Sequence, residues 1–219
     1  MYSMKYRLLL IALLFSVKVF AQQGFPFDNE IRAFKRQDSI RMPKPGGTLF
    51  IGSSSIRKWT DLQQRFPGEP IISRGVGGSE LSQWVKYYMP YVVFPYKPAK
   101  IFLYAGENDI ADGYSAQTVS EDLMKFYELM RQQLPNVEFY FMSIKHSPVR
   151  AIYYGEVDRA NQYIAGYLKG KPYTHYIDLN TVLKTSQAIP DSSLFNSDYL
   201  HLNSKGYDRW QKVLQAYIK

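Results

Sequence analysis

The chain has 219 residues, no cysteine and a formal net charge of +8 at pH 7. The absence of cysteine excludes a disulfide framework, a cysteine nucleophile and a thiolate metal site. No block of lysine and arginine is longer than two residues, so the positive charge gives little support to nucleic-acid binding.

Residues 1–21 have the pattern of a secretory signal peptide. Two basic residues precede an apolar run over Leu8–Val17, and Val19 and Ala21 are small residues at the two positions that a signal peptidase reads. The run is too short to span a bilayer, which takes about twenty residues. An uncleaved anchor is the alternative, because Lys18 lies close to the cleavage point. A lipid anchor is excluded because no cysteine follows the signal.

Cleavage before Gln22 predicts an exported protein, periplasmic or extracellular, with no stable membrane insertion afterwards. The mature chain would span residues 22–219. Its net charge would be +5, because the signal carries three basic residues and no acidic one. That length suits one domain with a full-sized core.

Apolar runs of strand length alternate with amphipathic segments of helical length, which indicates a parallel sheet with helical crossovers. Most runs are rich in β-branched and aromatic residues, as expected when both faces are covered. The predicted strands are Thr48–Ile51, Pro70–Ser73, Lys100–Tyr104, Glu138–Ile144 and Thr174–Leu179. The predicted helices are Ser55–Arg65, Leu81–Val93, Ala116–Gln133, Glu156–Lys169 and Ser204–Ile218, with an extra helix at Asn29–Arg41 outside the sheet.

The sequence contains no internal repeat, low-complexity tract or linker. The predicted fold is therefore a single doubly wound, flavodoxin-like α/β domain with three layers and a five-stranded parallel sheet. In such sheets, reactive groups collect on loops past the carboxyl ends of the strands.

Four short segments carry candidate chemistry; three of them lie just past predicted strands, and the fourth lies in the final loop. Gly52–Ser55 opens a helix, where backbone amides favour negative charge, although a lone serine there is usually an N-cap. Gly75–Ser79 lets a backbone amide approach a substrate, or forms a plain turn. Gly106–Asp109 offers a side-chain amide or a turn. Asp198–His201 can place a carboxylate against a histidine ring, or is only a surface pair.

The order of these segments along the chain resembles blocks one, two, three and five of the SGNH hydrolase family. The stretches LFIGSSSIRKW (49–59), YAGENDIAD (104–112) and DYLHLNSKGYDRW (198–210) are similar to the GDSL-like acylhydrolase branch that carries GSSS. The resemblance extends across nearly the whole mature chain.

The resemblance implies a serine esterase with Ser54 as nucleophile and His201 as general base and then acid. Asp198 would hold His201 in the right tautomer and stabilise its imidazolium form. The implied oxyanion hole consists of the backbone amides of Ser54 and Gly78 and the side-chain amide of Asn108. No metal or organic cofactor is required. The expected substrate is a carboxylic ester with a short acyl group, such as acetyl, on a carbohydrate or a small lipid-like alcohol.

Three positions depart from the family pattern. Ser53 stands where the family usually has Asp, as is common in this branch. Ser73 stands where block two often begins with Asn, so if that Asn braces the glycine loop, the loop is held differently here. His146 stands where the branch usually has proline. We interpret it as a solvated loop histidine, with a substrate contact as the alternative.

Other polar and aromatic residues near these segments have open roles. His175 is expected to be structural, and Asp109 to brace its loop or cap a helix, with a role as the triad acid as the alternative. Four tyrosines could form a platform for a sugar ring: Tyr87, Tyr88, Tyr91 and Tyr114.

Two other classes of protein compete with an esterase. The first is a catalytically inactive domain of the same family that binds glycans or a partner. The presence of all five implied site residues argues against this class. The second is a phosphate- or flavin-binding protein. It is disfavoured because the loop after the first strand lacks the glycine spacing and lysine of a P-loop.

Overall fold

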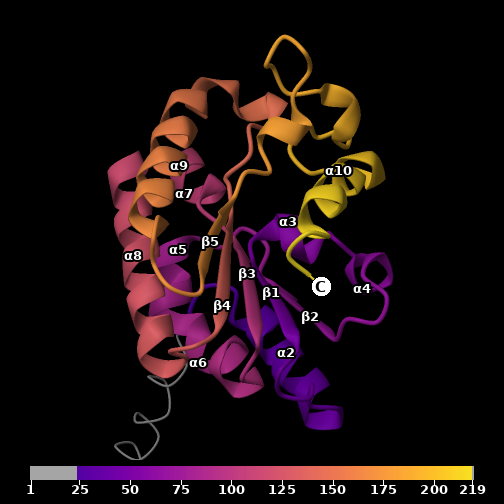
Figure 1. Ribbon diagram of the computed structural model, residues 1–219, viewed down its shortest axis with the longest axis vertical. Helices are drawn as coiled ribbons and strands as arrows, with labels where there is room; N and C mark the ends of the chain where they lie inside the picture. Colours follow the sequence, from indigo (N-terminus) through magenta and orange to yellow (C-terminus); the bar gives the residue numbers. More distant parts are fainter. Residues whose placement is uncertain (1–23, 219) are drawn as a thin grey trace, which may run out of the picture.

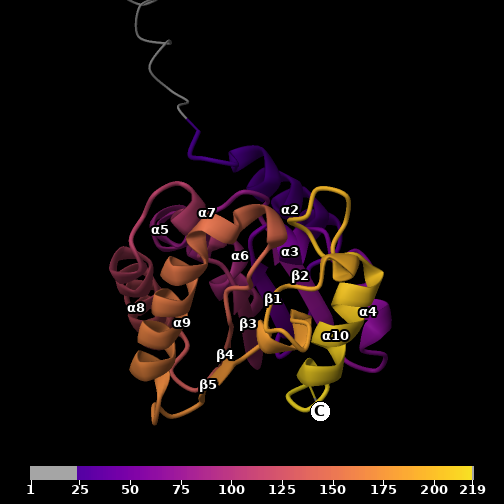
Figure 2. The same ribbon diagram turned by 90° about the horizontal axis from the view of Figure 1, so that it is seen from above.

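A computed structural model describes residues 24–218, so the predicted signal peptide lies outside the described residues. Within that range, five strands form one all-parallel sheet in the order β2-β1-β3-β4-β5. Helices cover both faces of the sheet (Figures 1 and 2). The predicted three-layer, doubly wound α/β fold is confirmed.

The strands are β1 (Thr48–Gly52), β2 (Ile71–Gly75), β3 (Lys100–Tyr104), β4 (Glu138–Met142) and β5 (Thr174–Ile177). The α-helices are α2 (Asp28–Ile40), α3 (Ser54–Arg57), α4 (Leu62–Arg65), α5 (Leu81–Gln83), α6 (Met89–Val92), α7 (Glu107–Ala111), α8 (Ala116–Gln133), α9 (Tyr154–Leu168) and α10 (Ser204–Leu214). None of the helices in the described range is long and apolar enough to cross a membrane.

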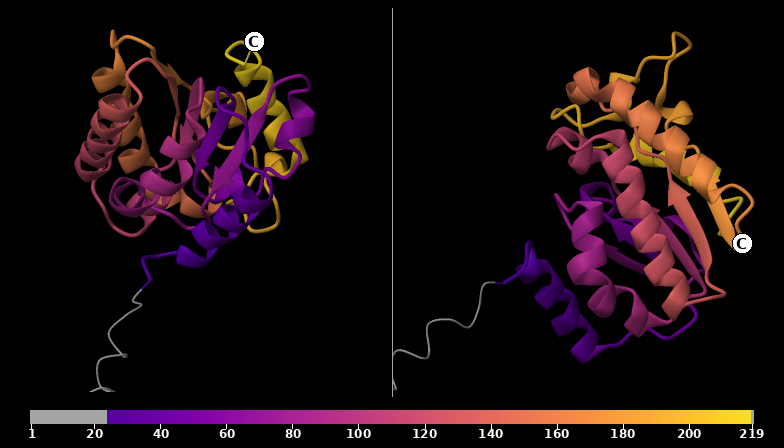
Figure 3. Two further views of the ribbon diagram at one scale, coloured as in Figure 1. Left: turned by 90° about the horizontal axis from the view of Figure 1, so that it is seen from below. Right: turned by 90° about the vertical axis from the view of Figure 1, so that its left-hand side faces the viewer.

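Side chains alternate between two separate cores, one on each face of the sheet. In β1, Leu49 and Ile51 belong to the core under α8 and α9, whereas Phe50 belongs to the core under α10. The long helices α8 and α9 pack side by side over the first core (Figure 3). On the other face, Phe50, Phe102 and Tyr140 stack across three neighbouring strands, with ring centroids 4.6 and 4.4 Å apart.

Two predicted helices are broken in the structure. The segment predicted as Ser55–Arg65 forms α3 and α4 with a turn at Trp59, whose ring is buried and stacks on Tyr207. The segment predicted as Leu81–Val93 forms α5, a π-helical turn at Trp84–Tyr88 and α6. Pro90 lies in the first turn of α6 and cannot donate to an earlier carbonyl, which favours a new helix start there.

The topology aligns the ends of the three central strands. In the sheet register, Gly52 at the end of β1 pairs with Gly75 of β2 on one side and with Tyr104 of β3 on the other. Since β1 lies between β2 and β3, this edge is the switch point where doubly wound proteins place their ligands. The segments that follow these strands therefore meet at one place.

Candidate active site

Ser54 is the first residue of α3, directly after β1. The turn depends on Gly52, which has a φ of +132° and approaches β3 so closely that a Cβ would lie 1.8 Å from the Tyr104 carbonyl oxygen. As the first residue of a helix, Ser54 has a backbone N–H with no acceptor within the helix. Its neighbours Ser53 and Ser55 are buried, so Ser54 is the accessible hydroxyl of the three.

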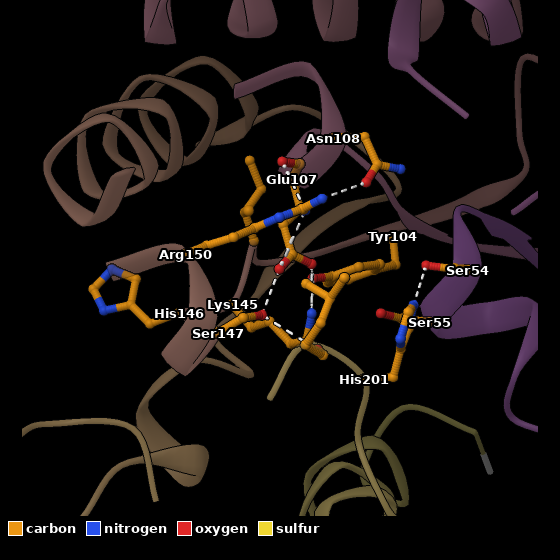
Figure 4. Close-up of polar contacts among 12 residues, drawn as sticks. Ser54, Ser55, Tyr104, Glu107, Asn108, Lys145, His146, Ser147, Arg150 and His201 are labelled. Atoms are coloured by element: carbon orange, nitrogen blue, oxygen red, sulfur yellow. Dashed lines mark hydrogen bonds and ion pairs between the residues drawn. The ribbon is translucent and has the colours of Figure 1, made fainter. Parts of the chain in front are cut away.

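A chain of hydrogen bonds joins Ser54 to His201 and Asp198. The Ser54 Oγ lies 2.9 Å from His201 Nε2, and His201 Nδ1 lies 2.7 Å from Asp198 Oδ2 (Figure 4 shows the serine–histidine contact). The other carboxylate oxygen of Asp198 accepts the backbone N–H groups of Leu200 and His201. The loop closes this tightly because Tyr199 adopts a left-handed conformation, with a φ of +51°.

The Asp198 carboxylate is held in its ionised form. Partial burial raises its pKa, but the hydrogen bonds from the His201 ring and from two backbone N–H groups outweigh that effect. The pKa of Asp198 therefore lies well below its usual range. Lys58 adds a positive charge 4.0 Å from the same carboxylate. This carboxylate can balance a positive charge on His201 across the neutral pH range.

The glycine loop after β2 is held by the N-terminal helix. The backbone N–H of Gly77 donates to Glu30 Oε2 at 3.2 Å, and the other oxygen of Glu30 accepts from Arg57 at 2.5 Å. Gly78 has a φ of +80°, and a Cβ on it would lie 3.1 Å from the Phe27 ring. The glycine loop is therefore held by Glu30 and Phe27, which lie far ahead of it in the sequence. Sequence reasoning placed the α2 helix but missed this role of Glu30 and Phe27, because no local pattern links them to the loop.

Asn108 lies in the first turn of α7, after β3. Its side-chain Nδ2 donates to the carbonyl of Ser79 at 3.1 Å, and its Oδ1 accepts from Arg150 at 3.2 Å. The next residue, Asp109, is buried and accepts the backbone N–H of Leu81 at 2.9 Å. Asn108 therefore ties α7 to the last residue of the glycine loop (Gly75–Ser79), and Asp109 ties it to the start of α5, which is the loop-bracing contact expected of Asp109.

Burial raises the pKa of Asp109 to about 7. Its Oδ2 has no hydrogen-bond partner among the described residues. Among the described residues, the His201 ring bonds to Asp198 and no hydrogen bond or ion pair joins it to Asp109, so the structure gives no support to the alternative that Asp109 is the triad acid.

A buried charged cluster lies behind Asn108 and was missed by sequence reasoning. Glu107 forms an ion pair with the fully buried Lys145 and also accepts hydrogen bonds from Ser147 and Tyr104. Burial raises the pKa of Glu107, but the charges of Lys145 and Arg150 outweigh it, so its pKa is lowered overall. The only signal in the sequence was a set of charged residues directly after the buried strand β4, which reads equally well as a solvated loop.

His146 was predicted to be a solvated loop histidine, and that prediction is wrong. The side chain is buried, stacks on Tyr154 with ring centroids 4.0 Å apart, and lies within 2.9 Å of an oxygen of Asp158. Burial lowers its pKa. In Figure 4 its ring points away from Ser54, so the structure does not bring it to the site.

The remaining candidates fall into two groups. His175 stacks on Tyr140 and lies 3.0 Å from Glu138, which fits the structural role predicted for it. Of the four tyrosines, Tyr88 is wholly buried and donates to the carbonyl of Pro26, so it cannot form part of a sugar platform. The rings of Tyr87 and Tyr91 stack on Phe25. Tyr114 is exposed.

Comparison with known proteins places the chain in a family. The model of the GDSL-like lipase/acylhydrolase family matches residues 46–209, whereas no curated protein sequence matches the chain.

Several solved structures share the fold. A protein from Streptococcus pneumonia described as a platelet activating factor has a TM-score of 0.78 and 21% identity, over 96% of this chain and 99% of that one. A GDSL-like lipase from Bacteroides thetaiotaomicron has a TM-score of 0.73 and 17% identity, over 86% and 96%. A carbohydrate esterase family 3 protein from Talaromyces cellulolyticus has a TM-score of 0.60 and 14% identity, over 78% and 95%. At sequence identities this low, the structural similarity shows that the fold is shared. Because the family model spans most of its length, the chain belongs to the GDSL-like lipase/acylhydrolase family and is a serine ester hydrolase.

Proposed function

We propose that Ser54, His201 and Asp198 form the catalytic triad of this hydrolase. The observation that carries the proposal is the continuous hydrogen-bonded chain from Ser54 Oγ through both ring nitrogens of His201 to Asp198. In this arrangement His201 Nε2 accepts the proton of Ser54 as its oxygen attacks the ester carbonyl. Asp198 fixes the tautomer and balances the imidazolium charge.

The reaction proceeds in two halves. In the first, the Ser54 Oγ forms a bond to the acyl carbon, and the alcohol leaves with the proton that His201 returns. In the second, His201 takes a proton from water, the hydroxide adds to the acyl carbon, and the carboxylic acid leaves as Ser54 regains its proton. Both halves pass through a tetrahedral oxyanion. We assign its stabilisation to the backbone N–H groups of Ser54 and Gly78 and to Asn108 Nδ2, each worth roughly 3–4 kcal/mol of barrier.

The proposed substrate is a carboxylic ester with a short acyl group, such as acetyl, on a carbohydrate or a small lipid-like alcohol. A charged side chain next to the site, Lys58, favours a polar alcohol, because covering a charge with hydrocarbon is costly. The likeness to a carbohydrate esterase agrees with a sugar ester. We further propose that the protein is exported, on the signal-peptide pattern alone.

A fluorophosphonate probe tests the nucleophile. Attack by Ser54 on phosphorus expels fluoride, and His201 takes the serine proton, so one covalent label on Ser54 is expected. Ser54→Ala should abolish labelling, whereas the matched controls Ser53→Ala and Ser55→Ala should keep it. Ser54→Ala and His201→Ala should each lower kcat by about 10⁴-fold or more, and the double variant should be little worse.

A panel of p-nitrophenyl esters of rising chain length, together with acetylated xylan and pectin fragments, tests the substrate. Highest kcat/KM on acetyl esters is expected. Absence of both labelling and turnover in folded protein would instead favour a binding domain that has lost its activity.

A further inference from the structure

The side-chain amide of Asn108 must have one particular orientation to serve the oxyanion. An amide has an acceptor oxygen on one side and a donor nitrogen on the other, and a half-turn about its last bond exchanges them. In the observed orientation Nδ2 uses one N–H on the carbonyl of Ser79 and keeps its second N–H for the oxyanion. The reverse orientation would present an oxygen to a negatively charged intermediate.

Arg150 contacts the opposite side of this amide. Its Nη2 donates to Asn108 Oδ1 at 3.2 Å, and its Nη1 donates to the backbone carbonyl of Glu107 at 3.1 Å. In Figure 4 the amide oxygen faces Arg150 and the amide nitrogen points away from it. Exchanging oxygen and nitrogen would set the amide donors against the guanidinium donors, so Arg150 disfavours the reverse orientation.

Arg150 is itself held by the buried cluster behind it. Its Nη1 lies 3.6 Å from Glu107 Oε1, and that carboxylate is fixed by Lys145 and Ser147. The Arg150 side chain is only 20% exposed, and it arises from a kinked 3₁₀ segment, Pro148–Tyr153, rather than from a mobile surface helix. The guanidinium therefore has a defined position relative to α7.

We propose that Arg150 is a positioning residue for the hydrolysis reaction. It locks the Asn108 amide with its nitrogen toward the oxyanion and acts through Asn108 rather than on the substrate. This inference rests on the proposed function, because it presumes that Asn108 donates to the oxyanion. A lysine could not replace Arg150 fully, since a single ammonium lacks the planar fork that reaches the Asn108 oxygen and the Glu107 carbonyl together.

A double-mutant cycle between the two residues tests the proposal. Arg150→Met removes the guanidinium and keeps the apolar stem. In the wild-type background it should lower kcat on p-nitrophenyl acetate by about 10–100-fold, with KM changed by less than about threefold. In the Asn108→Ala background the same substitution should lower kcat by less than about threefold, because there is no amide left to orient. All rates are normalised to the fraction of Ser54 labelled by fluorophosphonate.

Two further variants define the outcome. The kcat of Arg150→Lys should be about tenfold lower than that of the wild type. If Arg150→Met does not fold, Arg150→Lys takes its place in the double-mutant cycle. Arg159→Met is the matched control, because Arg159 is half-exposed on α9 and pairs only with Glu156 among the described side chains; its kcat should not change.

An equal loss of kcat in both backgrounds, a loss confined to KM, or no loss at all would overturn the positioning role. Labelling of Ser54 reports on the proposed function separately. Intact labelling without coupling between residues 150 and 108 therefore refutes this inference alone.

Discussion

Replacing Asp109 by asparagine should make the stability of the protein depend differently on pH. Asp109 is only 2% exposed, and one carboxylate oxygen has no hydrogen-bond partner among the described residues. Burial therefore raises its pKa from 3.8 to about 7. The introduced asparagine would keep an oxygen that can accept the Leu81 N–H, but it cannot ionise, so the Asp109→Asn variant isolates the effect of the charge.

The sign follows from where each state loses its proton. The unfolded chain ionises Asp109 near pH 4, whereas the folded protein keeps the proton until about pH 7. Between these values the folded state binds more protons, so this residue's contribution to the free energy of unfolding falls as the pH rises. A gap of about three pH units corresponds to ~4 kcal/mol. For a domain of this size, that equals roughly 8–16 °C in Tm.

Urea denaturation of both proteins at pH values from 4 to 8 measures the effect. The free energy of unfolding of Asp109→Asn, relative to wild type, should rise by ~4 kcal/mol between pH 4 and pH 8. The matched control is Glu128→Gln, which removes an exposed carboxylate on α8 and should give a nearly constant difference. A difference for Asp109→Asn that stays within about 1 kcal/mol over this range would refute the reasoning. Its kcat should stay close to wild type, because Asp109 lies outside the proposed triad.

Three further outcomes are expected. Lys145→Met should lower the free energy of unfolding by roughly 3–5 kcal/mol, because it leaves the buried Glu107 carboxylate without its partner; thermal denaturation measures this, and the exposed control Lys125→Met should change little. Asp198→Asn should lower kcat by roughly 10³–10⁴-fold in folded protein, since the tautomer of His201 is no longer enforced; if it keeps most of its turnover while Asp109→Asn loses it, the triad acid is misassigned. Intact-mass measurement of exported protein should give an N-terminus at or near Gln22, and retention of residues 1–21 would contradict the predicted cleavage.

The sheet could be predicted from the sequence because its strands are nearly continuous apolar runs. Each predicted strand overlaps an observed one, and the errors lie at the ends, as with β4, which was predicted to Ile144 and ends at Met142. The predicted helix from Ser55 to Arg65 was wrong in its middle. There the buried Trp59 ring, stacking on Tyr207 from the far end of the chain, decides the conformation, and such a contact leaves no local pattern.

In the candidate site, too, the residues in local motifs could be predicted, whereas the residues that hold them could not. Ser54, Gly78, Asn108, Asp198 and His201 lie in short motifs whose order along the chain could be matched to a family. Their supports could not be predicted, because each acts over a long separation in sequence. Arg150 contacts a residue 42 positions away, and Glu30 contacts one 47 positions away. In the local sequence, Arg150 and Glu30 look like ordinary charged residues of a loop and a helix. Only the folded structure shows that they contact Asn108 and Gly77.

The contacts from the N-terminal segment to the glycine loop mean that a chain can keep all the family motifs and still lose the position of this loop. Glu30 and Phe27 set the position of Gly77 and Gly78, yet both lie ahead of residue 46, where the match to the family begins. A chain shortened to that match would retain every family motif and lose the support of the loop. Substitutions at Glu30 or Phe27 would therefore disturb the position of the glycine loop without changing any residue of the proposed triad. The residues that hold the glycine loop thus extend beyond the segment that the family model matches.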